Sequence, residues 1–365
     1  MKRQLLYLII CLFFNPVLSA AFLSEGRDSV PVNDGPYISY LNDTLKVLRI
    51  EKSLVREEYL LPLSRSEINI SRNQSANYTE LIKVFSYKPD YRQSFKRVDS
   101  IAVISDVHGQ YDIYINQLMS NGIIDGNLNW KFGKGHLVYL GDAFDRGDKV
   151  TEVLWHLFGL EKQAAKAGGM VHFILGNHEL MVLDEDLRFI NEKYKNVEAI
   201  SGINYSGLYS ANTILGKWLR TKPVMITIND IIFVHGGISP ELVHRNLSIK
   251  QINQVFADSI VGRDIWSGKE NEALDFLAGD NGPVWYRGYF TDSTFSESSL
   301  DSILTFYEKA HIVVGHSTHK DIKSVFNNKI LGIDAGIMYN QPGSMLIYKE
   351  GCFYKGSITG KRDKL

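Results

Sequence analysis

Short apolar runs that end abruptly in polar, glycine-containing loops recur along the chain from about residue 101 onward. Five of these runs occupy residues 101–104, 137–140, 171–175, 231–234 and 312–314. A short continuous apolar run between polar flanks is typical of a strand that is buried on both faces. The pattern therefore predicts five buried strands whose C-terminal ends carry polar loops, which is where open α/β sheets place their sites.

Other segments of the pattern predict a helix and hairpins around these strands. Apolar residues recur at helical spacing over 150–165, and the glycine pair at 168–169 is expected to end that helix. Two strand pairs, within 224–234 and within 37–50, each flank an Asn-Asp pair and predict hairpins. Short strands and turns are expected from about 317 to 357.

Together these elements predict an α/β fold in which a mixed β-sandwich is flanked by helices. Residues 22–97 have no catalytic-looking pattern, and we expect them to form an N-terminal extension packed on the main domain. The catalytic domain is expected to span residues 98–365.

The first 21 residues have the pattern of a secretory signal peptide. Lys2 and Arg3 precede an apolar run from Leu5 to Phe14, and small residues follow, with cleavage expected after Ser19 or Ala21. Because a membrane anchor needs about 20 apolar residues, the shorter run favours cleavage over stable membrane insertion. The chain is therefore expected to be exported, either to a periplasm or out of the cell.

Charge and cysteine content exclude further classes of function. Forty Lys and Arg balance forty-one Asp and Glu, so the basic surplus of a nucleic-acid-binding protein is missing and no nucleic-acid partner is expected. Cys11 lies in the predicted signal, which leaves Cys352 without a partner for an intrachain disulfide. Ile358 stands where a cysteine-dependent tyrosine phosphatase would have Arg, so Cys352 is expected to be an ordinary residue of a terminal hairpin.

The five polar loops carry the residue types of a metal centre. Each loop alone has an ordinary explanation, because Asp after a strand is often a helix cap and Gly-Asn often a turn. Capping, however, requires neither the histidines nor so many glycines. Carboxylate and amide oxygens mixed with imidazoles suit divalent Mn, Fe or Zn, and two such ions about 3.5–4 Å apart can share one carboxylate and activate water for attack on a phosphate. The candidates are Asp106, His108, Asp142, Asp145, Asn177, His178, His235 and His316.

The order of these loops along the chain carries a resemblance. They read Ser105-Asp-Val-His-Gly109, Gly141-Asp-Ala-Phe-Asp-Arg-Gly147, Gly176-Asn-His-Glu179, His235-Gly-Gly237 and Gly315-His316. The series resembles that of the phosphoprotein phosphatase (calcineurin-like metallophosphatase) superfamily. It is most similar to the bacterial Shewanella-like phosphatases, which include the cold-active protein-tyrosine phosphatase. The resemblance implies a phosphomonoesterase that acts on phosphorylated proteins or peptides, with phosphotyrosine as the favoured ester.

The resemblance also implies a role for each residue. Arg146 and Arg287 would bind the phosphate oxygens, and a hydroxide bridging the two metals would attack. His178 would protonate the leaving oxygen while Asp145 orients its imidazole. The ions would be two of Mn, Fe, Zn or Co. The metal ligands would be Asp106 and His108 for the first ion, Asn177, His235 and His316 for the second, and Asp142 for both.

Three functions remain open on the sequence alone. Besides a phosphoprotein phosphatase, the scaffold fits a small-molecule or dinucleotide polyphosphate phosphatase, and the segments 183–222 and 262–300 are expected to shape the rim that decides between them. A phosphate-binding module without catalysis would have a broken motif, and every motif here is intact. Asp334 and His319 fit a supporting role beside the metals and a purely structural role equally well.

Overall fold

The computed structural model describes residues 30–42, 44–60, 67–71, 79–83, 92–262 and 272–365. The elements named below fall within the compact unit Val32–Leu365. The predicted signal peptide at 1–21 lies outside the described residues and stays a prediction. Among the described helices, none has the length and apolar character needed to cross a bilayer.

Two six-stranded mixed sheets form the centre of the fold. Sheet I has the order β17-β16-β15-β7-β8-β9, in which β7, β8 and β9 are parallel and the other neighbours are antiparallel. Its strands are β7 (Ser100–Ile104), β8 (His136–Leu140), β9 (Met170–Ile174), β15 (Met345–Lys349), β16 (Cys352–Gly356) and β17 (Arg362–Lys364). Cys352 begins β16 and lies in the β15–β16 hairpin, as predicted for this residue.

Sheet II has the order β13-β14-β12-β11-β10-β6. Its strands are β6 (Ser94–Phe95), β10 (Met225–Ile228), β11 (Ile231–Val234), β12 (His311–Val314), β13 (Lys323–Val325) and β14 (Ile330–Gly332). The antiparallel β10–β11 pair confirms the predicted hairpin, while β11, β12 and β14 are parallel to one another. All five predicted buried strands are present, as β7, β8, β9, β11 and β12.

The inner faces of the two sheets share one apolar core. Val138 and Ile174 of sheet I belong to the same buried cluster as Ile226, Phe233 and Val313 of sheet II. Because side chains alternate between the faces of a strand, the outer faces need a second apolar layer, and the helices supply it. The predicted mixed β-sandwich flanked by helices is thus confirmed.

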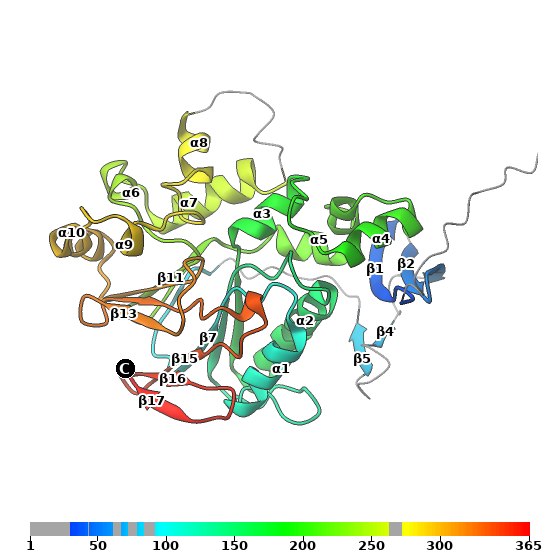
Figure 1. The fold of residues 1–365 in the computed structure, drawn as a ribbon, viewed down its shortest axis with the longest axis horizontal. Coiled ribbons are helices and arrows are strands. Elements are labelled where there is room, and N and C mark those ends of the chain that lie inside the picture. Colours follow the sequence, from blue (N-terminus) through cyan, green and yellow to red (C-terminus); the bar gives the residue numbers. More distant parts are fainter. Residues whose placement is uncertain (1–29, 43, 61–66, 72–78, 84–91, 263–271) are drawn as a thin grey trace, which may run out of the picture. The chain divides into compact units, whose positions relative to one another are not determined.

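Helices cover the outer faces of the sandwich (Figure 1). The helix predicted over 150–165 is α2, whose C-cap is Gly168 in left-handed conformation, as the glycine pair indicated. It packs on β9 and on α1, whereas α7 packs on β10. The α-helices are α1 (Tyr111–Ser120), α2 (Val150–Ala167), α3 (Asn177–Leu183), α4 (Glu192–Ser201), α5 (Ile214–Leu219), α6 (Pro240–His244), α7 (Ile249–Val255), α8 (Glu272–Ala278), α9 (Gly288–Thr291) and α10 (Glu297–Tyr307). Two short 3-10 helices, η1 (Tyr205–Tyr209) and η3 (Ile337–Tyr339), and one π-helical turn, η2 (Phe256–Ile260), are also present in the described residues.

A small three-stranded sheet precedes the sandwich in the chain. It comprises β1 (Asp34–Leu41), β2 (Thr44–Glu51) and β3 (Leu54–Leu60), and the β1–β2 pair confirms the hairpin predicted within 37–50. The indole N–H of Trp155 in α2 donates to the carbonyl of Pro36 in β1 (2.9 Å), and this hydrogen bond links β1 to the helical layer. Two further strands, β4 (Glu67–Ser71) and β5 (Thr79–Lys83), pair with each other.

The division between extension and catalytic domain at 97/98 stays a prediction. Residues 94–95, inside the predicted extension, form β6, which pairs with β10 in parallel.

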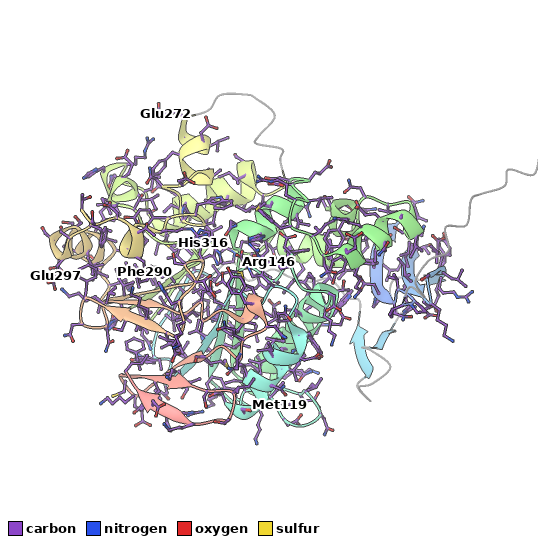
Figure 2. The ribbon with its side chains drawn as sticks, viewed as in Figure 1. Met119, Arg146, Glu272, Phe290, Glu297 and His316 are labelled. Atoms are coloured by element: carbon purple, nitrogen blue, oxygen red, sulfur yellow. The ribbon has the colours of Figure 1, made fainter. Side chains whose placement is uncertain are left out.

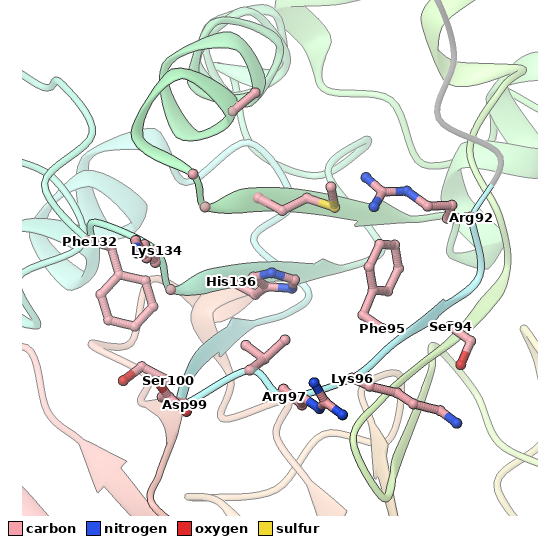
Figure 3. A pocket seen from close by; sticks show the side chains of 16 residues that line it. Arg92, Ser94, Phe95, Lys96, Arg97, Asp99, Ser100, Phe132, Lys134 and His136 are labelled. Atoms are coloured by element: carbon pink, nitrogen blue, oxygen red, sulfur yellow. The ribbon is translucent and has the colours of Figure 1, made fainter.

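A cavity of about 740 Å³ opens where β6 lies near the starts of β8 and β9. Figure 3 shows Phe95 and His136 in it, with the basic side chains of Arg92, Arg97 and Lys134 around them. The cavity lies at the N-terminal ends of the parallel strands, and none of the predicted site residues lines it. This cavity therefore does not identify the site, and the chemistry of the loops at the other ends of the strands must do so.

Candidate metal centre

The polar loops that follow β7, β8 and β9 of sheet I and β11 and β12 of sheet II meet at one edge of the sandwich. Within sheet I, the N–H of Asp106 donates to the carbonyl of Gly141 (3.1 Å). Within sheet II, the N–H of Gly315 donates to the carbonyl of His235 (2.8 Å). Between the sheets, the N–H of His316 donates to the carboxylate of Asp106 (3.0 Å). Figure 2 marks this edge by His316, which follows β12. The sandwich thus brings together loops that are more than two hundred residues apart.

Two glycines allow these loops to approach so closely. Gly141 has φ +85°, and a Cβ there would lie 2.5 Å from Nδ1 of His235. A Cβ on Gly176 would lie 2.2 Å from a carboxylate oxygen of Asp142. Because real Cβ atoms do not approach other atoms so closely, only glycine fits at either position.

Most of the candidate side chains are attached to backbone in the left-handed region. Non-glycine residues rarely adopt a positive φ, and such conformations cluster at functional sites because the surrounding structure must enforce them. Of these eight candidates and the two predicted phosphate-binding arginines, six residues have this geometry: Asp106 (51°), His108 (46°), Asp142 (58°), Asp145 (69°), Arg146 (63°) and His316 (62°). The fold therefore aims these side chains into the site against their local backbone preference.

Asp142 lies at the centre of the cluster. Its Oδ2 is 3.2 Å from Nε2 of His235, 3.6 Å from Nε2 of His108 and 3.9 Å from Nε2 of His178. Two buried sets of three residues each bring their donor atoms within 4.8 Å of one another: His108, Asp142 and His178, and Asp142, His235 and His316. Asp142 is shared by both sets, which is the arrangement needed of a carboxylate that bridges two ions.

The remaining two predicted ligands also reach the cluster. Oδ1 of Asn177 lies 3.1 Å from Nε2 of His235, and the carboxylate of Asp106 accepts the backbone N–H of His316 at 3.0 and 3.1 Å. In the first set of three, however, His178 takes the place expected for Asp106. The predicted roles of Asp106 as a metal ligand and of His178 as the general acid therefore both stay predictions.

The histidines are oriented so that Nε2 of each ring can bind a metal. Nδ1 of His108 lies 2.7 Å from the carbonyl of Phe144, and Nδ1 of His235 lies 2.7 Å from the carbonyl of Leu140. A carbonyl can only accept, so each Nδ1 donates, and Nε2 is the nitrogen of each ring that can bind a metal once it is deprotonated. Nε2 of His316 is buried and has no hydrogen-bond partner among the described residues. The donor set fits divalent ions such as Mn, Fe, Zn or Co.

Charge in the cluster is poorly balanced without a cation. Burial alone would lower the pKa of His235, but the carboxylates of Asp142 and Asp106 outweigh it and raise that pKa to about 10. Burial lowers the pKa of His108 to about 3. Burial would also raise the pKa of Asp142, yet the imidazoles of His235 and His178 hold it well below its usual range. A proton on His235 thus does what a bound cation would do, and metal and proton should compete for the site.

His178 and Asp145 form a buried pair beside this cluster. Nδ1 of His178 lies 2.5 Å from a carboxylate oxygen of Asp145. Burial would lower the pKa of His178, but the carboxylates of Asp142 and Asp145 outweigh it, so the pKa is raised. This environment favours the doubly protonated imidazole, which is the form that a general acid requires.

Two exposed arginines flank the site. Arg287 donates from Nη1 to the carbonyl of His316 (2.6 Å), and its Nη2 lies 3.4 Å from Nδ1 of the same residue. Neither Arg146 nor Arg287 forms an ion pair with a carboxylate among the described residues. Their guanidinium groups are therefore available for the oxygens of a phosphate, whose geometry and charge they match.

Glu179 is a site residue whose role was missed in the sequence. It is fully buried, and its carboxylate accepts the backbone N–H groups of Asp142 (2.8 Å), Ala143 (2.7 Å) and Gly176 (2.7 Å). Burial and the nearby Asp142 raise its pKa to about 7. Glu179 thus ties the loop after β8 to the loop after β9. The signal was its place in Gly176-Asn-His-Glu179, where metal ligation and proton transfer did not account for a third polar residue.

Asp334 supports the loop that follows β12. Its carboxylate accepts the hydroxyl of Thr318 (2.5 Å) and the backbone N–H of Gly336 (3.0 Å), and its carbonyl accepts the N–H of His319 (2.9 Å). Its charge also helps to raise the pKa of Asp106, after burial. Because this loop carries the predicted ligand His316, these contacts favour a supporting role beside the metals for Asp334 over a purely structural one.

Comparisons with known proteins agree with this geometry. A model of the calcineurin-like phosphoesterase family matches residues 100–320. The chain is 31% identical over 254 residues to Shewanella-like protein phosphatase 1 of Plasmodium berghei, covering 66% of this chain and 69% of that one, and 24% identical over 289 residues to Shewanella-like protein phosphatase 2 of Arabidopsis thaliana, covering 67% and 72%. The crystal structure of the cold-active protein-tyrosine phosphatase of a psychrophilic Shewanella species superposes with a TM-score of 0.83 at 36% identity, covering 91% of this chain and 99% of that one.

Proposed function

Because the chain belongs to the calcineurin-like phosphoesterase family, and within it to the Shewanella-like protein phosphatases, it is a metal-dependent phosphatase, and we propose that it hydrolyses phosphotyrosine esters of proteins. One arrangement carries the ester chemistry: the His178–Asp145 pair and the guanidinium groups of Arg146 and Arg287 surround the donor set centred on Asp142. The preference for phosphotyrosine is supported by the 36% identity to a protein-tyrosine phosphatase over nearly its whole length.

We infer that two ions are held in the site, with Asp142 common to both. Asp106 and His108 would complete the first set of ligands, and Asn177, His235 and His316 the second. When bound, the ions supply Lewis acidity toward the phosphoryl group and lower the pKa of the attacking water. Mn, Fe, Zn and Co all suit this mixture of oxygen and imidazole donors.

The arginines bind and orient the substrate in this proposal. Arg146 and Arg287 hold the non-bridging phosphate oxygens, so that the bond to the leaving oxygen points toward His178. Fixing the ester in this way converts a bimolecular encounter into a step within one complex, which is a large part of phosphoryl-transfer catalysis.

His178 supplies the proton in this proposal. As the bond between phosphorus and the leaving oxygen breaks, that oxygen takes the proton from Nε2 of His178. Water contributes the hydroxyl group that phosphorus gains, and the proton that the water releases restores His178. Asp145 keeps Nδ1 protonated and stabilises the imidazolium before the transfer. The products are inorganic phosphate and the free alcohol or phenol.

The cellular setting is also part of the proposal. The basic n-region, apolar run and small residues at the start of the chain support export to a periplasm or out of the cell. Expression of the full-length chain in a bacterial host with an intact export pathway, followed by fractionation and N-terminal sequencing, tests this. A mature protein that begins at Ala20 or Phe22 in the exported fraction is expected. Retention of the uncleaved chain in the cytoplasm contradicts export.

A substrate panel tests the substrate class. The metal-loaded enzyme should be assayed on phosphotyrosine, phosphoserine and phosphothreonine peptides with identical flanking residues, and on nucleotides and dinucleotide polyphosphates. We expect the highest kcat/KM for phosphotyrosine peptides. A nucleotide or dinucleotide polyphosphate turned over more efficiently than every peptide would instead establish the small-molecule alternative.

A further inference from the structure

Phe189 is an exposed aromatic ring beside the proposed general acid. It is 41% exposed, although large apolar side chains in this protein are mostly buried. The centroid of its ring lies 5.5 Å from that of His178, with the two planes tilted by 59°. Metal binding, phosphate binding and proton transfer leave this ring without a role.

The ring is held in place from several sides. The N–H of Arg146 donates to the carbonyl of Phe189 (3.0 Å), and the side-chain amide of Asn191 donates to the carbonyl of Arg146 (2.7 Å). The guanidinium carbons of Arg146 and Arg188 lie 5.3 and 5.5 Å from the ring centroid. Arg188 is itself held by two hydrogen bonds to Asp186, at 2.7 and 2.8 Å. A ring fixed in this way costs little entropy when a ligand packs on it.

We propose that Phe189 is the wall on which the phenol ring of phosphotyrosine packs, and that it is a specificity-determining residue of this site. The proposal rests on the proposed function and deepens it. A proton on His178 can reach only an oxygen within about 3 Å, and in phosphotyrosine that oxygen is bonded directly to the ring. The substrate ring must therefore lie next to His178, in the region that Phe189 borders.

The same geometry predicts that Phe189 contributes little to the binding of aliphatic phosphate esters. In phosphoserine the leaving oxygen is attached to a single methylene, which offers little surface for an aromatic wall. Arg146 is placed to hold the phosphate on one side of Phe189, so a bound phosphotyrosine would have its charged end at the guanidinium and its ring against the phenyl group. Offset or edge-to-face contact between such rings is favourable beyond the area that it buries.

Substitution of Phe189 by Ala tests the proposal. Kinetics should be measured on a phosphotyrosine and a phosphoserine peptide with the same flanking residues. Stacking energies of aromatic pairs correspond to about a 3- to 10-fold effect, which should raise KM for the phosphotyrosine peptide. Because the contact is present in both the bound substrate and the transition state, kcat should not change. The phosphoserine peptide should keep both parameters.

Two control variants separate recognition from folding. Phe189→Tyr keeps the ring and should retain the wild-type KM for phosphotyrosine. Tyr59→Ala removes another exposed ring (53% exposed), which lies on β3, and should leave both substrates unaffected.

Each other outcome rejects a defined part of the account. If wild-type enzyme shows no preference for phosphotyrosine, the proposed function fails and this inference falls with it. If the wild type shows the preference and Phe189→Ala retains it, only the role of Phe189 is rejected. Equal losses of kcat on both peptides would assign Phe189 to the support of Arg146 and His178, and would overturn the proposal.

Discussion

Two groups of buried charged side chains in the described part of the chain balance their charge in different ways. In the first, which we call the tyrosine cluster (Asp34, Tyr37, Glu152, Lys193 and Tyr194), the hydroxyl of Tyr37 donates to Asp34 (2.7 Å). The ammonium group of Lys193 lies 3.5 Å from Asp34 and 3.9 Å from Glu152. The cluster contains its own cation, and it joins β1 to α2 and α4.

The metal centre contains no such cation. Among the described residues, Asp106, Asp142 and Asp145 form no ion pair with a lysine or arginine, and their close partners are histidines and backbone N–H groups. Buried carboxylates alone therefore do not identify a site, because the tyrosine cluster has them too. Carboxylates that lack a basic side chain, faced by imidazoles and attached to strained backbone, indicate a place for a metal.

Of the substitutions that test this difference between the clusters, Asp142→Asn should cause the largest loss of activity. The change keeps the volume but takes negative charge from between the two proposed ions, which leaves their repulsion less balanced. Because such ions stabilise the transition state by several kcal/mol, activity should fall on the order of 10³-fold or more on every substrate. Elemental analysis should show that metal content falls together with activity. Full retention of both ions would contradict the bridging role.

His178→Asn should have a large effect that depends on the substrate. A phenol leaves with a pKa of about 10 and needs little protonation, whereas a serine-like alcohol needs much more. Hydrolysis of phosphoserine should fall by about 10²- to 10⁴-fold, and that of phosphotyrosine or nitrophenyl phosphate by much less. Asp145→Asn should show the same bias in milder form.

The metal content of His178→Asn decides between its two possible roles. Retention of the metals supports the general acid, whereas loss of an ion would place His178 among the ligands, as its position near His108 and Asp142 also allows. Equal losses on all substrates, with chemistry shown to limit the rate, would reject the acid role.

Glu179→Gln should have an intermediate effect. It removes one of the two oxygens that accept backbone N–H groups from the loops after β8 and β9, so the ligands on those loops lose support. Residues that support metal ligands typically contribute about 10- to 100-fold to metal affinity or activity. Metal titrations should therefore show weaker binding, with activity partly restored at high metal concentration. Unchanged metal affinity would assign Glu179 to general stability only.

Glu152→Gln should affect stability and spare catalysis. Burial raises the folded-state pKa of Glu152 from 4.5 to about 7, so the protonated form is favoured in the fold. Its contribution to stability is present below about pH 4.5 and is lost as the pH rises through about 7. Gln mimics the protonated form of Glu152. The free energy of unfolding of the variant should therefore exceed that of wild type by at most about 3 kcal/mol at pH 8 and by little at pH 4.

Thermal or denaturant unfolding across this pH range measures the effect of Glu152→Gln. The kcat of the variant at pH 8 serves as the control and should match that of wild type. A loss of metal content in this variant would show that the two clusters are not independent.

The sequence allowed the framework of the fold to be predicted because its signals are local. Buried strands appear as short apolar runs, and the end of α2 is indicated by its own glycines. The two-residue strand β6 was missed, because pairing with β10, more than a hundred residues away, defines it rather than any local pattern.

The candidate site was also predictable only where its signals are local in the sequence. Its residue types and loops could be identified from the sequence, whereas the grouping of His178 with His108 and Asp142 depends on where side chains point in space. Glu179 and Phe189 were missed for a related reason. The carboxylate of Glu179 bonds to the backbone of another loop, and the ring of Phe189 becomes meaningful only beside His178.

The central claim, that this edge of the sandwich is a dinuclear metal centre, is tested most directly by metal removal and return. The protein should be stripped with a chelator, shown by elemental analysis to be metal-free, and assayed during titration with Mn or Co. We expect no phosphatase activity without metal, and recovery that saturates at two ions per chain. Full activity in protein proven to be metal-free, or saturation at a single ion, would contradict the account.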